Sequence, residues 1–400
     1  MKDLYQQDVM EMIERESRQF QFWSIETPDD PDFQPAYDLL WDAFGDRGEM
    51  EREEPIRQFL LDNPFEPVPS GTYIRYFLLV AKDQRGKIVG VRDGSILVNP
   101  GYAPDLCATY LAHIFVRPEA RGTVMSYWLR VAPIEMAMQY LAELHQRGLI
   151  TLPAPDQPGR HFGMRMNLTA EMEYFAPEDR LSLQRILFYG RGGFDVIDPK
   201  HFPYVQPDYR DPEEIRQTGN NPVPFMVLLR RMGRERQARI PIDEAVATMK
   251  LLYDDFAAFC APEHLANSLD RVMRRLEDRR AAGKTTVDLL PMPTGSKDLG
   301  RLRRLWRYPV YRAFYPPNLM AVREYLEDFA AHGFGGTQKW LDEQLADIAR
   351  TLDTRPHFVY GSRDRAFNWD GSPESPPQEL MESEPTGEFQ IPPEVMRLIR

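Results

Sequence analysis

The stretch from His113 to Leu129, HIFVRPEARGTVMSYWL, is the part of the sequence whose residue order most directly suggests chemistry. An apolar run ends at Val116, and Arg121-Gly122 follow at the start of a helical pattern. The first turn of a helix has backbone N–H groups without intrahelical partners and carries the positive end of the helix dipole. The segment therefore predicts an anion-binding turn suited to a diphosphate. An ordinary strand-to-helix turn would give the same pattern.

A second informative segment lies about sixty residues further on and reads LSLQRILFYGRGGF, from Leu181 to Phe194. Its helical pattern ends with Tyr189, and Gly193 can reverse the chain because glycine tolerates a positive φ. A phenol with a pKa near 10 keeps its proton at neutral pH and can donate it. Tyr189 is therefore a candidate general acid. Packing of a helix-end aromatic ring against a sheet is the alternative interpretation.

Together, the two segments resemble the GNAT (general N-acetyltransferase) superfamily over about residues 22–232. The family's loop is matched by Val116-Arg117-Pro118, by Arg121-Gly122 and by the small residue Ser126. Val124 departs from the family pattern, which has a glycine there. The family's Tyr-x-x-x-Gly-Phe motif is matched by Tyr189, Gly193 and Phe194.

The resemblance implies an acyl-CoA-dependent N-acyltransferase, with acetyl-CoA as the expected donor and direct transfer to an amine acceptor. Tyr189 would protonate the leaving thiolate. The family fixes no single base, so His113, Glu171 and Glu173 are candidates, His113 because imidazole titrates near neutrality. The residues expected to contact the cofactor are Phe115, Val116, Arg121, Gly122, Thr123, Val124, Met125 and Ser126.

Two other functions stay open from the sequence. A longer acyl-CoA or an acylated carrier protein would place less demand on the diphosphate loop and would fit Val124. Alternatively, a degenerate GNAT fold could serve as an interaction or scaffold protein. The acceptor cannot be read from the sequence, because binding pockets on a common fold are built from variable loops.

The order of elements predicts an α/β fold with a GNAT-like mixed central sheet flanked by helices. Two β-rich runs separated by the turn Asp83–Gly86 predict a hairpin. A near-continuous apolar run, 107–116, predicts a central strand. The remaining predicted elements are a helix at 123–146, a strand at 164–173, a helix at 181–189 and strands at 194–197 and 224–229.

The pattern changes after residue 240, where apolar residues recur at helical spacing. We therefore expect three parts: an acyltransferase domain over 1–235, an all-α domain over 240–355, and a mostly disordered acidic tail over 362–400. The helical half is compatible with a lid, a substrate platform or the interface of a homodimer.

Composition excludes several classes of protein. The net charge of −12 over 400 residues argues against nucleic acid as a partner, because phosphate binding needs a basic footprint. The two cysteines, Cys107 and Cys260, form no metal-binding or disulfide pattern, so no metal site is predicted. The charged N-terminus and the lack of a long apolar run predict a cytoplasmic protein without membrane spans.

Overall fold

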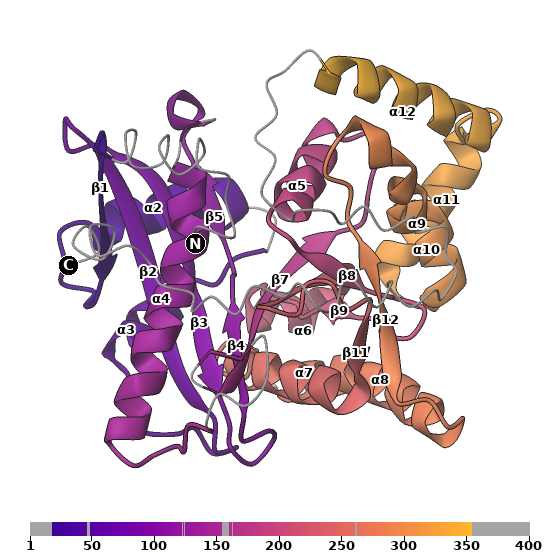
Figure 1. Cartoon of the computed structure of the whole chain (residues 1–400). Coiled ribbons are helices and arrows are strands. Elements are labelled where there is room, and N and C mark those ends of the chain that lie inside the picture. Colours follow the sequence, from indigo (N-terminus) through magenta and orange to yellow (C-terminus); the bar gives the residue numbers. More distant parts are fainter. Residues whose placement is uncertain are drawn as a thin grey trace, which may run out of the picture.

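The computed structural model describes residues 18–45, 49–121, 123, 125–153, 160–161, 163–260 and 262–353. The predicted acidic tail lies outside these ranges, as do Gly122 and Val124 of the predicted anion-binding turn. Within them, helices flank a mixed sheet (Figure 1), which confirms the predicted fold class for this part of the chain. No helix of the described residues is long and apolar enough to cross a membrane.

The elements follow the predicted order. The first part contains β1 (Phe20–Ile25), α2 (Phe33–Phe44), α3 (Glu53–Leu61), the hairpin of β2 (Tyr73–Asp83) and β3 (Ile88–Val98), β4 (Leu106–Tyr110), β5 (Ile114–Val116) and α4 (Met125–Gln146). The second contains β6 (Arg160–His161), β7 (Met164–Glu173), α5 (Arg180–Arg191), β8 (Asp195–Ile197), β9 (Val205–Gln206), α6 (Pro212–Thr218) and β10 (Val223–Arg231).

Helices follow in the remainder of the described chain, as expected: α7 (Ile242–Phe256), α8 (Pro262–Ala281), α9 (Leu302–Leu305), α10 (Arg307–Phe314), α11 (Met320–His332) and α12 (Thr337–Asp353). The prediction of an all-α region needs one correction, because this part also supplies β11 (Arg239–Pro241) and β12 (Thr286–Pro291). β12 pairs with β8 and buries Val287, Leu289 and Leu290. Such a short strand between two helices leaves little periodicity to detect.

The main path of the sheet has the order β1-β2-β3-β4-β7-β10-β8-β12-β11. β4 and β7 pair in parallel, whereas the other paired strands of the described chain are antiparallel. Because strands β8 and β12 share this sheet, it continues across the predicted boundary near residues 235–240. The division into separable domains stays a prediction, for limited proteolysis to test.

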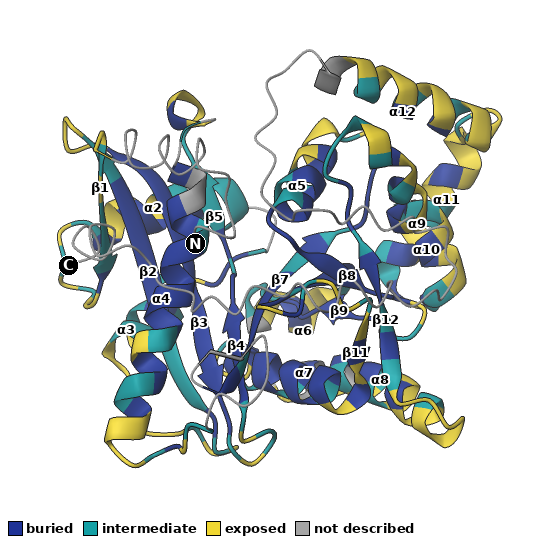
Figure 2. Cartoon of the chain, viewed as in Figure 1, coloured by how far each residue is buried: buried dark blue, intermediate teal, exposed yellow. Residues whose placement is uncertain are grey.

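Alternating side chains divide the core between the two faces of the sheet. Met226 and Leu228 of β10 pack with α4, α5 and the C-terminal helices, whereas Phe225, Val227 and Leu229 pack with α7 and α8. On the α7 side, α2 and α3 cover β2 and β3 with a third cluster. Figure 2 shows the strands largely buried and the outer surfaces of the C-terminal helices exposed. The sheet is therefore covered on both faces.

A buried ion network fastens α7 to the sheet. Glu244, which is 1% exposed, accepts hydrogen bonds from Arg234 at 2.8 and 2.9 Å, from Arg231 at 3.2 Å and from Arg165 at 3.1 Å. Although burial disfavours its charge, Arg234 and Arg231 lower its pKa to about 2. Breaking such a network would leave buried charges uncompensated, so it fixes the position of α7 over the sheet.

One extra residue interrupts the central strand. β3 pairs with β4 at Ser95 and Tyr110, and with β5 at Arg92 and Ile114. Between these pairs, two residues of β3 lie opposite three residues, 111–113, of the segment that joins β4 to β5. This arrangement is a β-bulge, which bends a strand and leaves part of its ladder unpaired. The strand therefore changes direction between β4 and β5.

Gly94 lies on β3 opposite the bulge. A Cβ atom on Gly94 would stand 2.0 Å from the carbonyl oxygen of Tyr110 and 2.8 Å from the ring of Phe77. The first contact is with backbone, which cannot move aside as a flexible side chain can. Glycine is therefore required for this close approach. The prediction of one unbroken strand over 107–116 is therefore wrong: the bulge divides this segment into β4 and β5. The sequence does not reveal the break, because apolar residues continue through it.

Replacing Gly94 with alanine should lower the free energy of unfolding by about 1–3 kcal/mol, or prevent folding, because the added methyl overlaps the Tyr110 carbonyl. Gly300→Ala is the matched control, since a Cβ there meets nothing within 4 Å. Urea unfolding followed by circular dichroism compares the two variants. Equal unfolding free energies would contradict a tight contact between β3 and the bulge.

Candidate active site

The sheet opens between β5 and β7. Tyr110 is opposite Thr169 in the parallel pair of β4 and β7, and the Leu111 N–H still donates to the Thr169 carbonyl at 2.8 Å. Beyond the bulge, β5 pairs with β3, while β7 continues to Glu173 beside β10. The two strands therefore separate after Leu111, and we call the β5 side of this separation the open edge.

Backbone groups of two residues point toward the open edge. The Asp93 N–H donates to the His113 carbonyl at 3.3 Å, and the Arg117 N–H donates to the Val89 carbonyl at 2.9 Å. Alternate residues of an antiparallel strand turn their N–H and C=O groups to opposite sides. Ile114 and Val116 therefore face the open edge. Phe115 and Val116 are both predicted cofactor contacts. Phe115 turns its backbone toward β3, so of these two residues Val116 offers its backbone to a ligand at the open edge.

The predicted anion-binding turn lies at the end of β5. Thr123 Oγ1 donates to the Ala120 carbonyl at 2.7 Å and accepts from the Met125 N–H at 3.4 Å, so it helps to start α4. Arg121 is exposed, and its Nε donates to the Val116 carbonyl at 3.0 Å. Met125 is fully buried, so its side chain is not available to a ligand, and its N–H already has Thr123 as a partner. The side chain of Ser126, like Gly122 and Val124, lies outside what is described.

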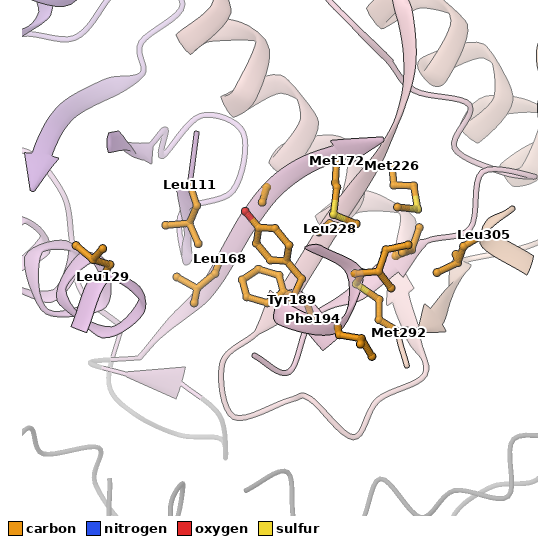
Figure 3. Close-up of a cluster of buried hydrophobic side chains, with 14 of the residues drawn as sticks. Leu111, Leu129, Leu168, Met172, Tyr189, Phe194, Met226, Leu228, Met292 and Leu305 are labelled. Carbon is orange, nitrogen blue, oxygen red and sulfur yellow. The ribbon is translucent and has the colours of Figure 1, made fainter. Parts of the chain in front are cut away.

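Tyr189 lies on α5, as predicted, with its side chain directed toward the region between β4 and β7. Its ring packs edge-on against Phe188 and Phe194, each with centroids 5.3 Å away. The hydroxyl end points toward Leu111 in Figure 3, where Leu168 lies nearby. Gly193, at φ +81°, adopts the expected left-handed conformation. The catalytic role of Tyr189 stays a prediction.

Arg92 of β3 is a neighbour of Tyr189 that the sequence analysis did not single out. It is 0% exposed, and none of its three guanidinium nitrogens has a hydrogen-bond partner of good geometry. Burial lowers the pKa of Arg92 and Arg130 lowers it further, whereas Asp93 and Tyr189, whose hydroxyl is within hydrogen-bonding reach, oppose the shift. A buried cation without an ion pair among the described residues is costly in free energy, so this position suits an anionic group of a ligand.

His113 and Asp93 lie on the opposite face of the sheet, beneath α2 and α3. His113 Nδ1 is 3.1 Å from each Asp93 carboxylate oxygen, and Nε2 is 2.8 Å from the Glu49 carbonyl oxygen. Both ring nitrogens therefore face acceptors. Burial opposes protonation, but Asp93 raises the pKa of His113 to about 10. His113 is consequently an imidazolium at neutral pH and a weak candidate for the general base predicted from the sequence.

Asp93, Glu51 and Glu171 interact with this imidazolium, and Asp255 interacts with Glu51 and Asp93. We call Glu51, Asp93, Glu171 and Asp255 the acidic cluster. Burial raises the pKa of Glu171 and of Asp255 to about 8 each, and raises that of Glu51. Glu171 Oε2 accepts from the Tyr110 hydroxyl at 3.4 Å, whereas its Oε1 has no partner. Glu171 therefore has a pKa closer to neutrality than His113, whereas Glu173, the third predicted candidate, pairs with Arg185 at 2.7 Å. A general base works best in that range.

The sequence carried a signal for part of this site. Arg92 and Asp93 interrupt the otherwise apolar β3, and charged residues in a central strand are rarely buried without a partner or a function. Asp255 lies at the buried face of α7, but only the tertiary fold brings it to β3. No set of three or more His, Cys, Asp or Glu residues in the described ranges could hold a metal ion.

Comparisons with known proteins give a likeness of fold over about half of the chain. No protein-family model matches, and no curated protein sequence matches. The spermidine N-acetyltransferase of Vibrio cholerae in complex with CoA and spermine is 12% identical, covers 55% of this chain and 99% of its own, and has a TM-score of 0.29. A GNAT-family acetyltransferase of Staphylococcus aureus is 13% identical, covering 52% and 98% with a TM-score of 0.27.

An aminoglycoside acetyltransferase from an uncultured soil metagenomic sample is 14% identical, covers 43% of this chain and 86% of its own, and has a TM-score of 0.27. At such low identity and score, the likeness assigns no donor, acceptor or residue role to this chain.

Glu171→Gln should become more stable than the wild type as pH rises from about 5 to 8. The folded pKa of Glu171 is about 8, above the ordinary 4.5, so the unfolded chain loses this proton first and wild-type stability falls across that window. Glutamine cannot ionise, which should give the variant a relative gain of about 1–3 kcal/mol at pH 8. Urea unfolding at pH 5, 6.5 and 8 measures it.

Glu324→Gln, at an exposed position of α11, is the control and should follow the wild type at each pH. Parallel pH curves for Glu171→Gln and the wild type would show that Glu171 ionises at its ordinary pKa.

Proposed function

We propose that the chain is an acyl-CoA-dependent N-acyltransferase that transfers an acyl group, acetyl in the first instance, directly to an amine. One observation carries the proposal: the sheet opens at a single bulge, with Tyr189 and Arg92 on one face and the acidic cluster on the other. The two faces offer opposite chemistry to the two reactants of an acyl transfer.

The donor would bind along the open edge. Backbone N–H groups of Ile114 and Val116 can hold an extended amide-containing chain as a neighbouring strand would. Arg121 and the N–H groups at the start of α4 are available to phosphates at the end of β5. When bound, the thioester supplies an activated acyl carbonyl. A backbone donor at this edge can stabilise the oxyanion that develops there.

The leaving group would depart on the Tyr189 side. As the carbon–sulfur bond breaks, negative charge gathers on sulfur and a proton must reach it. The Tyr189 hydroxyl can donate that proton, and the adjacent Arg92 guanidinium, which is buried, can stabilise the negative charge. The buried guanidinium of Arg92, which forms no ion pair among the described residues, fits an anionic or electron-rich ligand atom better than it fits a solely structural role.

The acceptor would approach from the α7 side, where a base must take a proton from the amine. We infer that Glu171 takes this role, because its Oε1 is without a partner and its pKa lies near neutrality. His113 instead donates to Asp93, holding one carboxylate of the site in place.

Tyr189→Phe should lower turnover by about one to three orders of magnitude while leaving acyl-CoA affinity nearly unchanged, because the lost hydroxyl acts mainly in the transition state. Thiol release from acyl-CoA, with or without an identified acceptor, measures turnover. Tyr308→Phe, in the aromatic group of α10, is the control and should keep full activity. Wild-type turnover in Tyr189→Phe would remove this residue from the mechanism.

Arg92→Met should weaken CoA-induced thermal stabilisation without destabilising the free protein. The variant removes an unpaired buried charge but keeps an apolar stem, so the unligated melting temperature should stay the same or rise. The increase in melting temperature caused by a fixed, high concentration of CoA should become smaller, because stabilisation by a ligand follows its affinity. A panel of CoA, acetyl-CoA and longer acyl-CoAs measures both quantities and ranks the donors.

Arg85→Met, in the exposed turn between β2 and β3, is the control for Arg92→Met. A large loss of stability with an unchanged ligand shift would mean that Arg92 is structural. A wild-type protein that no CoA compound stabilises would instead favour an interaction or scaffold role.

A further inference from the structure

The acidic cluster collects carboxylates from distant parts of the chain at one place on the α7 face. Glu51 precedes α3, whereas Asp93, Glu171 and Asp255 belong to β3, β7 and α7. The Tyr110 phenol lies near all four: burial raises its pKa most, and each of these carboxylates raises it further. The cluster is therefore one electrostatic unit beside the point where β4 and β7 separate.

The cluster carries more negative charge than the chain compensates. Among the described groups that shift the pKa values of Glu51, Glu171 and Asp255, His113 is the only cation. Four ionised carboxylates and one imidazolium would leave three negative charges in a buried place. Without a ligand, the cluster retains protons instead, because ionisation without a counter-charge is costly there.

Several polar atoms around the cluster lack hydrogen-bond partners, which is an independent sign of a missing ligand. Glu171 Oε1, Asp255 Oδ1 and the Tyr209 hydroxyl are out of contact with solvent and without partners. Asp255 as a whole is 2% exposed. Buried polar atoms are normally satisfied. Once Glu171 and Asp255 ionise, their oxygens can only accept, so a ligand that replaces their protons must itself donate hydrogen bonds.

The surroundings favour an organic cation over a metal ion. No three carboxylate, histidine or cysteine side chains of the described residues are arranged for a metal, so the charges are spread rather than focused. Aromatic rings also border the cluster: Tyr110 packs against Phe256 at 5.4 Å, and Tyr209 packs against Phe256 at 6.2 Å. Faces of such rings attract ammonium groups. A ligand carboxylate would be repelled by the four carboxylates, and both ring nitrogens of the one cation, His113, already face acceptors.

We propose that the acidic cluster is the acceptor site of the proposed transferase, and that the acceptor is a small aliphatic amine with at least two ammonium groups and no carboxylate. One ammonium would be held between Asp255 and Glu51, while the amine to be acylated would lie at Glu171, next to the open edge. That the bound amine is the acceptor of an acyl group rests on the proposed transferase function. Binding of the diamine itself does not require CoA.

Binding of such a dication should release protons at pH 7. Its charge replaces the protons on Glu171 and Asp255, both of which have a raised pKa. Tyr110 and Glu51 face both side chains. Glu171 is also faced by His113, Gln206, Tyr209, Tyr253 and Cys260, and Asp255 by Tyr76, Asp93, Ser95 and Asp254. Since His113 is already charged at this pH, the released protons come from carboxyl groups.

Isothermal titration calorimetry of the full chain without CoA tests the proposal with three probes of matched length. 1,4-Diaminobutane should bind at least about ten-fold tighter than butylamine, and 4-aminobutanoate should not bind. Titrations at pH 7 in two buffers of different ionisation enthalpy count the protons, and one to two should be released per diamine. Magnesium and manganese chlorides should neither bind nor compete.

Asp255→Asn should weaken diamine binding at least about ten-fold and reduce the number of released protons, whereas Asp270→Asn on the exposed side of α8 should do neither. Should Asp255→Asn fail to fold, Glu171→Gln provides the same comparison. Equal binding of the three probes, no proton release, metal competition, or unchanged binding in the variants would overturn the proposal. Diamine binding without acyl transfer would leave the site standing and overturn the transferase function alone.

Discussion

The extra residue between β4 and β5 is the constraint on which the rest of the molecule depends. Without it, the strand would run beside β7 along its whole length and the sheet would be closed. The bulge requires Gly94, because the Tyr110 carbonyl lies where a side chain would begin. The same bulge turns the backbone of Ile114 and Val116 toward the open edge, so one local irregularity creates a place where a ligand can complete the hydrogen bonding of the sheet.

Charge is distributed unequally across this opening. Consecutive residues of a strand point to opposite faces, so Arg92 and Asp93 place a cation on the α4 side and a carboxylate on the α7 side. Each is then joined by groups from elsewhere, Arg130 on the first side and Glu51, Glu171 and Asp255 on the second. In a poorly solvated interior these separated charges act strongly on nearby groups, because little water screens them. An electron-rich leaving group and a cationic amine would each find a matching face.

Local patterns predicted the elements that depend on local sequence. The hairpin, α4, β7 and α5 could be located, as could the chain reversal at Gly193, because periodicity and turn residues specify them. The bulge could not be predicted, since apolar residues continue through 111–113. Nor could β12, whose pairing with β8 spans about ninety residues. Predicting the acidic cluster would require the same long-range information. Asp255 lies near Asp93 because the ion network of Glu244 holds α7 against the sheet.

The cost of these buried, unsatisfied groups is itself informative. The free energy of unfolding of a domain is a small difference between large terms, so a buried guanidinium without an ion pair among the described residues and two partnerless carboxyl oxygens lower it considerably. Apolar side chains of similar size at Arg92 and Asp255 would pack as well and cost less. Local strain or poor solvation of this kind is typically concentrated where a ligand later compensates it. The uncompensated cation and carboxylates occupy the two faces of one opening in the sheet. This arrangement favours two ligands of opposite charge that meet at the opening.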